Sequence, residues 1–362
     1  MTDPYHHIYQ GEIFQQSQCI WHENTLMDFF RSQLQCLGYT AIDDSNKVWQ
    51  RDNRTVVVCL ADDFSTCRQH QDSRFSYQFS TDTTVITDNH ATVPTQYRIC
   101  QLPASYFGIY SHSPSQSQWM PDRRFNFSVN RIDPKRLLLM LEIWNRTMLW
   151  QLENNLQPQD HRDYINFNCW SWQGQNTTPS ALQQNFMDLW EQLDVSYHRV
   201  YQHVFDDLWS RMPWRNHDLS HELSHVRAWC NLVVETYSSD NNIALSEKTF
   251  RALCLPVPWM IYSGRHTVAY LHALGFDTLQ DLFAHSYDSL IENNTAAYGD
   301  KMVVWGIEAD ETVAALKTRI FGDLQQRLDQ AALHNQKLLH QFRQQWPQQF
   351  AQWWPAVLQH IQ

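Results

Sequence analysis

Residues 229–276 read WCNLVVETYSSDNNIALSEKTFRALCLPVPWMIYSGRHTVAYLHALGF, and this stretch decides the expected fold. The short apolar run at 232–234 has the composition and length of a strand, and a polar loop follows it at 238–242. Residues 250–255 read as a helix that two prolines end, and 259–262 read as a second strand. Because a strand, a helix and a second strand form a βαβ unit, we predict a parallel sheet that binds its ligand at the carboxyl ends of its strands.

Polar and charged residues stand at the two places where this unit would bind a ligand. Glu235 follows the first strand. The start of the helix holds four further candidates: Ser246, Glu247, Lys248 and Thr249. Ser246 can cap that helix, although Thr249 stands where a complete capping box has Glu or Gln. A helix N-terminus with a lysine suits a diphosphate and a carboxylate suits a ribose diol, so these residues predict a site for a nucleoside diphosphate.

The pattern as a whole resembles the donor-site signature of GT-B glycosyltransferases. It runs Glu-Thr-Tyr-Ser at 235–238, Ser-Glu-Lys-Thr-Phe-Arg at 246–251 and Leu-Pro-Val-Pro-Trp-Met-Ile-Tyr-Ser-Gly at 255–264. It is similar to the α1,3-fucosyltransferases, and more similar to a bacterial and phage glycosyltransferase family whose pattern continues into Leu-Gly-Phe and Ser-Tyr-Asp, here at 274–276 and 286–288. Thr236 stands where the fucosyltransferases have Asn, and the loop is slightly longer, which leaves the donor sugar open.

This resemblance covers about residues 229–291, with a weaker patch near 125–136. It implies an α/β protein of the GT-B class, in which two Rossmann-like domains face a cleft, with a long helical C-terminus. It also implies transfer of a sugar from a nucleotide-sugar co-substrate to a glycan acceptor, with inversion and without a metal or other cofactor. The resemblance to the bacterial family suggests surface-polysaccharide synthesis as the setting.

The best linker in the chain is the polar stretch SHSPSQSQ at 111–118. It divides an N-terminal acceptor-side α/β domain, 1–118, from a nucleotide-sugar-binding α/β domain, 119–318. Residues 319–362 are expected to form a helical segment that packs back on the domains. The continuous apolar run at 55–60 predicts a strand that is buried on both faces.

Two acids follow that buried strand, Asp62 and Asp63. Acids at the carboxyl end of such a strand are placed to act as catalytic or ligand-binding groups. Since inversion without a metal needs a base for the acceptor hydroxyl, both are candidates for that base. The alternative is that either acid caps the following turn.

Two arginines extend the predicted phosphate site. The alternating run at 125–129 predicts a strand, and Pro134 stands in the first turn of the helix that follows. Arg131 is then at the strand end and Arg136 at the helix start, where guanidinium groups can bind phosphate oxygens. The alternative is that both arginines pair with surface acids.

The spacing of apolar residues predicts the remaining strands and helices. Strands are expected at 48–49, 84–86, 97–102, 106–110 and 164–172. Helices are expected at 23–38, 180–193, 200–212 and 267–274, and over most of the chain from 308.

The amino-acid composition indicates which partners and which cellular compartment to expect. A formal net charge of -11 without a long basic run argues against nucleic acid. The eight cysteines form no CxxC pair, no apolar signal core begins the sequence, and no apolar run reaches membrane-spanning length, so we expect a cytoplasmic protein. Aromatic residues cluster at 342–354; we expect them to pack on the first domain, and contact with a partner or the inner face of a membrane is the alternative.

The strongest rival interpretation is a zinc site. His221-Glu222-Leu223-Ser224-His225 fits HExxH, and His217 extends the same helical spacing. The sequence offers no third ligand at the spacing of the extended motif, so a solvated histidine face is the simpler interpretation. A zinc hydrolase and a non-catalytic sugar- or nucleotide-binding protein remain the alternatives to the glycosyltransferase, for which we expect no metal.

Overall fold

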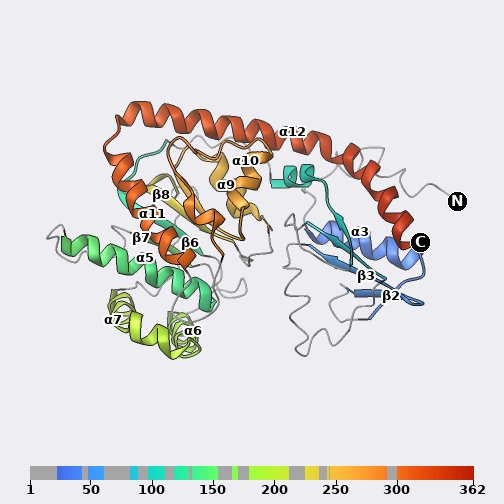
Figure 1. Ribbon diagram of the computed structural model, residues 1–362, viewed down its shortest axis with the longest axis horizontal. Coiled ribbons are helices and arrows are strands. Elements are labelled where there is room, and N and C mark those ends of the chain that lie inside the picture. Colours follow the sequence, from blue (N-terminus) through green and yellow to red (C-terminus); the bar gives the residue numbers. More distant parts are fainter. Residues whose placement is uncertain are drawn as a thin grey trace. The chain divides into compact units, whose positions relative to one another are not determined.

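The computed structural model describes residues 23–42, 48–60, 82–88, 97–110, 118–129, 133–153, 165–169, 179–211, 225–235, 243, 245–291 and 300–362 (Figure 1). The chain divides into two compact units, each assembled from separate stretches of sequence. Unit 1 contains residues 1–113, 237–250 and 336–362, and unit 2 contains residues 114–236 and 251–335. Each unit combines helices with a sheet that has parallel strands, so the protein belongs to the expected α/β class.

Unit 1 is built on a five-stranded mixed sheet in the order β1-β2-β3-β4-β5. β3 and β4 pair in parallel, as do β4 and β5, whereas β1, β2 and β3 are joined by antiparallel pairs. The three valines Val56, Val57 and Val58 of β3 are all buried, as the continuous apolar run predicts. The strands are β1 (Thr40–Ala41), β2 (Val48–Arg51), β3 (Arg54–Cys59), β4 (Thr83–Thr87) and β5 (Arg98–Gln101).

In the part of the chain that the structure describes, four helical elements complete unit 1, and one of them, α12, carries the aromatic cluster of 342–354. They are α3 (Glu23–Cys36), the 3₁₀ helix η1 (Ala104–Tyr110), the start of α9 (Glu247–Cys254) and the second part of α12 (Phe321–Ile361). The ring centroid of Phe29 on α3 lies 5.4 Å from those of Phe350 and Trp354 on α12. Trp346 is buried and lies 5.5 Å from Tyr106 of η1. Most of the aromatic cluster therefore packs inside unit 1, while its contact with a partner or a membrane stays a prediction.

Residues 106–110 form the helix η1, and the prediction of a strand there was wrong. All side chains from 105 to 109 are buried, whereas a half-buried strand alternates. A Cβ on Gly108 would lie 2.1 Å from the backbone nitrogen of Arg343, so only glycine permits this approach of two backbones. A short apolar run does not distinguish a buried strand from a short helix by its periodicity.

Unit 2 is built on a four-stranded parallel sheet in the order β7-β6-β8-β9 (Figure 1). Val234 of β8 lies opposite Tyr262 of β9, and α9 connects the two strands along the chain. The predicted βαβ unit is therefore confirmed. The strands are β6 (Arg123–Val129), β7 (Ile165–Cys169), β8 (Ala228–Val234) and β9 (Trp259–Tyr262).

One face of this sheet carries the main hydrophobic core. Phe125 and Phe127 of β6 and Leu232 and Val234 of β8 lie on this face, two residues apart along each strand, and they pack with helices α5, α6, α7 and α11. Burial of each large side chain contributes about 1.5–3 kcal/mol. The helices of unit 2 are α5 (Pro134–Glu153), α6 (Pro179–Glu191), α7 (Val195–Arg211), α10 (Thr267–Ala273), the 3₁₀ helix η4 (Ser286–Ser289) and α11 (Asp300–Lys317), with the first part of α12.

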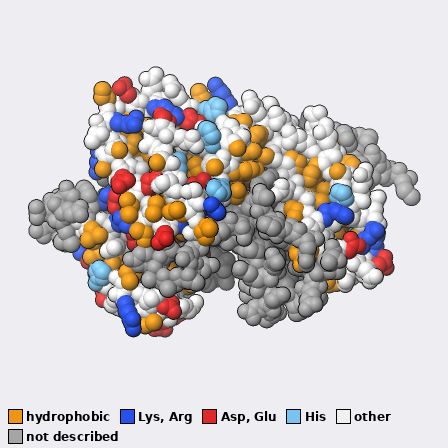
Figure 2. Space-filling model, in the orientation of Figure 1, with side chains coloured by type: hydrophobic (Ala, Val, Ile, Leu, Met, Phe, Trp, Pro, Cys, Tyr) orange, Lys and Arg blue, Asp and Glu red, His pale blue; other side chains and the backbone are white. Residues whose placement is uncertain are grey.

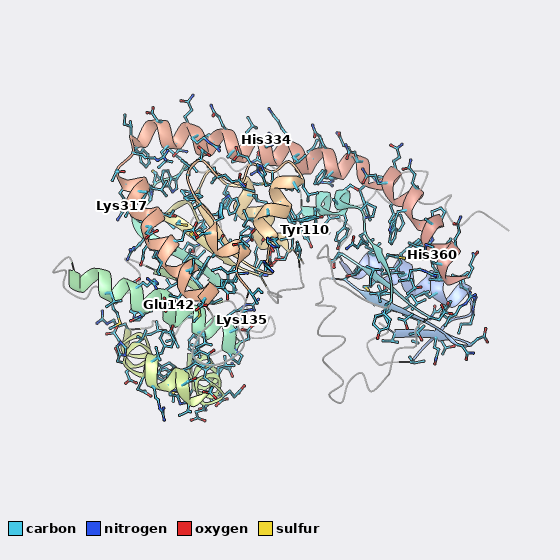
Figure 3. All side chains as sticks on the ribbon, in the orientation of Figure 1. Tyr110, Lys135, Glu142, Lys317, His334 and His360 are labelled. Carbon is cyan, nitrogen blue, oxygen red and sulfur yellow. The ribbon has the colours of Figure 1, made fainter. Side chains whose placement is uncertain are left out.

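Ion pairs and a hydrogen bond connect four of these elements, and Asp310 on α11 also lies 3.8 Å from the guanidinium of Arg146 on α5. The guanidinium of Arg124 on β6 lies 2.6 Å from the carboxylate of Asp310 on α11. On α5, Nε of Arg146 donates to Oε1 of Glu142 at 2.7 Å (Figure 3). The hydroxyl of Tyr201 on α7 donates to the other Glu142 oxygen at 2.7 Å. Because Arg124 and Glu142 are buried, these bonds offset the large cost of removing their charges from water.

The visible surface of the described residues mixes both signs of charge. Figure 2 shows basic and acidic side chains interspersed on the same face. Large apolar side chains such as Met120, Val195 and Ile320 are exposed, which is ordinary for single residues. Among the described residues, none of the helices combines the length and the apolar composition that a membrane span requires.

Candidate functional site

The order of strands in unit 2 reverses between β6 and β8. From β6 the chain passes through α5 to β7 on one side, and it then returns to the other side of β6 to form β8 and β9. In open parallel sheets, ligands bind outside the carboxyl ends of the strands on either side of such a reversal. The residues that follow β6 and β8 therefore stand where a ligand is expected to bind.

Glu235 follows β8 at this reversal. Its backbone N–H donates to the carbonyl of Tyr262 at 3.0 Å, so the pairing of β8 with β9 continues to this residue. Glu235 is buried, with only 2 % of its surface exposed. The structure thus places a buried acid at the end of β8, the position from which we expect it to bind a ribose.

Helix α5 begins after β6 and carries Arg136 in its first turn. Oδ1 of Asp133 accepts a hydrogen bond from the backbone N–H of Arg136 at 2.8 Å and caps the helix. The other Asp133 oxygen lies 3.5 Å from the guanidinium of Arg136, which is buried. An acid partner for Arg136 is therefore present, and its role as a phosphate ligand stays a prediction. Arg131 lies outside the described residues.

The start of α9 holds the expected cap. Oγ of Ser246 accepts a hydrogen bond from the backbone N–H of Lys248 at 3.3 Å. The ammonium of Lys248 lies 3.4 Å from the same oxygen and 3.6 Å from Oε1 of Glu247, so it stands over the first turn of its own helix. Its side chain is 14 % exposed, and Thr249 is fully buried. These four residues belong to unit 1, whereas Glu235 and Arg136 belong to unit 2.

Phe250 of the Ser-Glu-Lys-Thr-Phe motif fixes this helix start within unit 1. Its ring stacks on Tyr110 of η1 with the centroids 5.0 Å apart and the planes at 13° (Figure 3). Phe107 lies 5.0 Å away as well. Because Phe250 is fully buried, this aromatic contact holds the turn that carries Lys248 against η1.

Sequence reasoning missed two lysines at the carboxyl end of β9. The ammonium groups of Lys135 on α5 and Lys301 on α11 lie over the ring of Tyr262, each 5.4 Å from its centroid. Lys301 is 1 % exposed, and its Nζ donates to the carbonyl of Ser263 at 2.6 Å. The sequence gives little indication that these lysines belong to a site. Lys135 stands beside Arg136 at a predicted helix start, and Lys301 lies in no recognisable motif.

The segment after β9 shows what the resembling motif tail does in this fold. The carboxylate of Asp288 accepts hydrogen bonds from the N–H groups of Val268 and Ala269 and caps α10. Gly275 ends α10 with φ +94°, a conformation that favours glycine. Tyr287 is fully buried, and its hydroxyl accepts from the N–H of Ile261 at 3.1 Å. Burial raises the pKa of this phenol well above its ordinary value, so the group stays neutral. The motif tail therefore supports β9 structurally.

Beside it, His285 is buried between two partners. One ring nitrogen lies 2.8 Å from the carbonyl of Thr278 and must donate to it, and the other lies 3.2 Å from the hydroxyl of Tyr287. Burial lowers the pKa of His285, and this effect outweighs the hydrogen bond to Thr278 and the nearby acids, which raise it. His285 is accordingly a neutral structural residue.

A buried acid follows β4, an inner strand of the unit 1 sheet. Asp88 comes directly after β4 and is 2 % exposed. Since β4 pairs in parallel with β3, both strands end at the same edge of the sheet. Asp62 and Asp63, the candidates that follow β3 in sequence, lie outside the described residues. Asp88 also follows a strand, but the apolar run before it is only two residues long and predicts a strand less strongly than the run before Asp62 and Asp63.

His225 of the HExxH motif lies in a buried polar cluster. Its Nδ1 is 3.0 Å from Nδ2 of Asn126, which also donates to Oδ1 of Asn231 at 2.9 Å. His217, His221 and Glu222 lie outside the described residues. Within the described ranges, the structure shows no group of three or more His, Cys, Asp or Glu side chains that could hold a metal ion.

Comparison of the chain with models of known families, with curated proteins and with solved structures gives no match. The function is therefore inferred from the residues themselves. Unit 2 places a buried acid and the capped start of α5 at the ends of parallel strands, and unit 1 holds the capped start of α9 with Lys248. Each of these features is chemistry suited to part of a nucleoside diphosphate.

Proposed function

We propose that the protein is a glycosyltransferase that moves a sugar from a nucleotide-sugar donor to a glycan acceptor. The observation that carries the proposal is the unit β8-α9-β9, in which Glu235 follows the first strand and Ser246 caps the helix that presents Lys248. It joins the chemistry expected of a nucleoside-diphosphate site to the sequence pattern that resembles GT-B enzymes. The strand reversal between β6 and β8 supports the same placement of the ligand.

In this proposal, the charges divide between the parts of the donor. Arg131, Arg136 and Lys248 neutralise the diphosphate and stabilise it as it leaves. Glu235 or Glu247 accepts hydrogen bonds from the ribose hydroxyls. The buried position of Glu235 favours Glu235 over Glu247. A hydrogen bond to a carboxylate shielded from water is stronger, so such a carboxylate distinguishes better between a ligand that has the ribose hydroxyls and one that lacks them.

Transfer with inversion and without a metal requires a base for the acceptor hydroxyl. In a GT-B arrangement of two Rossmann-like domains, the N-terminal domain supplies that base. Asp62 and Asp63 are the sequence-based candidates, and Asp88 joins them because it is a buried acid at the end of β4. The acceptor is proposed to be a glycan of a bacterial surface polysaccharide, made at the cytoplasmic side of the membrane.

A thermal-shift screen tests donor binding. The wild-type chain is heated with GDP, UDP, CMP, ADP or dTDP, with and without zinc and EDTA, because a ligand that binds only the folded state raises the midpoint. One diphosphate should stand out. Lys248→Ala should lose that shift while its own unfolding midpoint without ligand is kept. Lys337→Ala is the matched control, since Lys337 is an exposed lysine of the same unit.

Three other outcomes would redirect the proposal. Equal shifts in wild type and Lys248→Ala would remove Lys248 from the donor site. A flat nucleotide response with a large fall in EDTA, together with zinc lost on His221→Ala, would favour a zinc hydrolase. Nucleotide binding without transfer from any nucleotide sugar would favour a non-catalytic binding protein.

A further inference from the structure

Two lysines from different helices converge on one ring where β9 ends. Lys135 and Lys301 each place Nζ over the ring of Tyr262, 5.4 Å from its centroid. Because both distances refer to one point, the two ammonium groups can be no further apart than twice 5.4 Å. Lys135 stands in the first turn of α5, which follows β6, and Lys301 stands in the first turn of α11. Both charges therefore lie at the carboxyl edge of the sheet in unit 2.

The two lysines differ in exposure and so in what they can do. Lys301 is 1 % exposed, and its bond to the carbonyl of Ser263 at 2.6 Å fixes it to the backbone beyond β9. Lys135 is partly exposed and can reach a molecule from solvent; Figure 3 shows it on α5. The contact with Tyr262 orients each ammonium group through the negative face of the ring.

The chemistry of this edge favours an anion. Lysine binds phosphate as a point charge, and the starts of α5 and α11 add the positive ends of two helix dipoles. A diphosphate carries negative oxygens on two adjacent phosphorus atoms, so it can interact with more than one cation. Glu235 stands beside Tyr262 in the pairing of β8 with β9, which places the ribose candidate next to the lysines along the edge.

We propose that Lys135 binds a phosphate group of the donor directly, and that Lys301 is a positioning residue that holds Ser263 and the Tyr262 ring for this contact. The inference rests on the proposed function, because it names the residues of unit 2 that meet the diphosphate of that donor. The alternative is that both lysines only stabilise the end of β9.

Calorimetric titration of the full chain separates these possibilities. The probes are the nucleoside diphosphate that stands out in the screen, its unphosphorylated nucleoside and inorganic pyrophosphate. Lys135→Gln should bind the diphosphate at least about tenfold more weakly and the nucleoside equally well, because one charge-assisted bond to phosphate is removed. Lys135→Arg should stay within about threefold of wild type, since it keeps the charge.

The matched control is Lys317→Gln. Lys317 belongs to the same helix as Lys301 and also lies over an aromatic ring, that of Trp229 at 5.7 Å, but it stands at the last turn of α11 (Figure 3). Trp229 is at the start of β8, the opposite edge of the sheet. This variant should bind all three probes as wild type does.

Lys301 is tested with Lys301→Arg, which keeps the buried charge but changes how it meets the Ser263 carbonyl. Weaker diphosphate binding with unchanged nucleoside binding supports the positioning role, since a general loss of stability would weaken both. Unchanged binding of both probes overturns that role. Stability without ligand is followed in parallel by the thermal midpoint.

The failure of this inference differs from the failure of the proposed function. Equal diphosphate affinity in wild type and Lys135→Gln overturns the inference and leaves donor binding in place. Absence of nucleoside-diphosphate binding by wild type overturns the proposed function. In that case, pyrophosphate binding that depends on Lys135 would still support an anion site, and its absence would overturn both.

Discussion

The carboxylate of Asp288 accepts a hydrogen bond from the backbone N–H of Val268 at 2.9 Å and thereby caps α10 from 20 positions further along the chain. Its second oxygen accepts from the N–H of Ala269 at 3.1 Å. The backbone N–H of His266 in turn donates to the carbonyl of Asp288 at 2.8 Å. One residue thus closes the segment that follows β9 into a compact loop through three hydrogen bonds.

Asp288→Ala should lower the free energy of unfolding by about 1–3 kcal/mol, because two N–H groups of a buried helix start lose their acceptor. Asp288→Asn keeps one acceptor oxygen and should lose less. Urea unfolding followed by circular dichroism measures both. Asp323→Ala is the control, since Asp323 is exposed in the first turn of α12, and it should stay within about 0.5 kcal/mol of wild type. Equal effects of the two alanine variants would contradict the capping role.

Gly306→Ala should destabilise the protein although alanine is the better helix former by about 1 kcal/mol. An added Cβ would lie 2.5 Å from Nε of Arg146 and 3.2 Å from Oε1 of Glu142. Since Arg146 is bonded to Glu142, it cannot move aside without breaking that ion pair, and we expect a loss of about 1–3 kcal/mol. The thermal midpoint measures this effect.

Gly322→Ala is the matched control on α12, where nothing lies within 4 Å of the added Cβ. It should be neutral or slightly stabilising. The same glycine substitution is also made in an Arg146→Ala background. There, Gly306→Ala should lower the thermal midpoint by less than it does in the wild-type chain, because the side chain that it crowds is gone. If the two glycine variants shift the midpoint equally, the crowding around Gly306 has no energetic weight.

The buried His285 should make stability depend on pH. Its pKa is lowered in the folded state, so between that value and its ordinary value of about 6.5 the unfolded chain binds more protons. Stability is therefore fully present above pH 6.5 and is lost as the pH falls. Replacing it with His285→Gln should reduce the slope of unfolding free energy against pH by up to about 1.4 kcal/mol per pH unit. The exposed His340→Gln serves as the control, and an unchanged slope in His285→Gln would refute the assignment.

Asp88→Asn tests the newly found acid in unit 1. If Asp88 is the base of the proposed reaction, turnover should fall by about 100-fold or more, while donor affinity stays unchanged. Asp62→Asn and Asp63→Asn are measured beside it. Asp82→Asn is the matched control, because Asp82 is an exposed acid before the other end of β4 and should keep full turnover. Full turnover in Asp88→Asn would return the choice to Asp62 and Asp63.

The sequence predicts helix and strand limits well where neighbouring residues set them. The strand at 259–262 begins and ends where the prolines at 256 and 258 and the Ser-Gly at 263–264 place its limits. Helix α7 begins at Val195, five residues before the predicted start, because Asp194 caps it through the N–H of Ser196 at 2.8 Å. The Asp-x-Ser pattern at 194–196 is a helix-start signal that the sequence itself contains.

Other features were beyond the reach of local patterns. The burial of Gly108 against the backbone of Arg343 depends on a contact between residues more than two hundred positions apart. The convergence of Lys135 and Lys301 on Tyr262 likewise depends on how three elements pack. A linker-based boundary also assumes domains that are continuous in sequence, whereas both units are assembled from separate stretches.

The assembly of unit 1 from separate stretches has a consequence for its synthesis. Residues 336–362 belong to this unit, and the hydroxyl of Tyr39 donates to the carbonyl of Ile361 across 322 positions. Unit 2 ends at residue 335, so its whole sequence is made while unit 1 still lacks the part of α12 that packs on α3 and η1. The stretch that is translated first is thus completed last, although its five strands can already pair with one another before residues 336–362 are made.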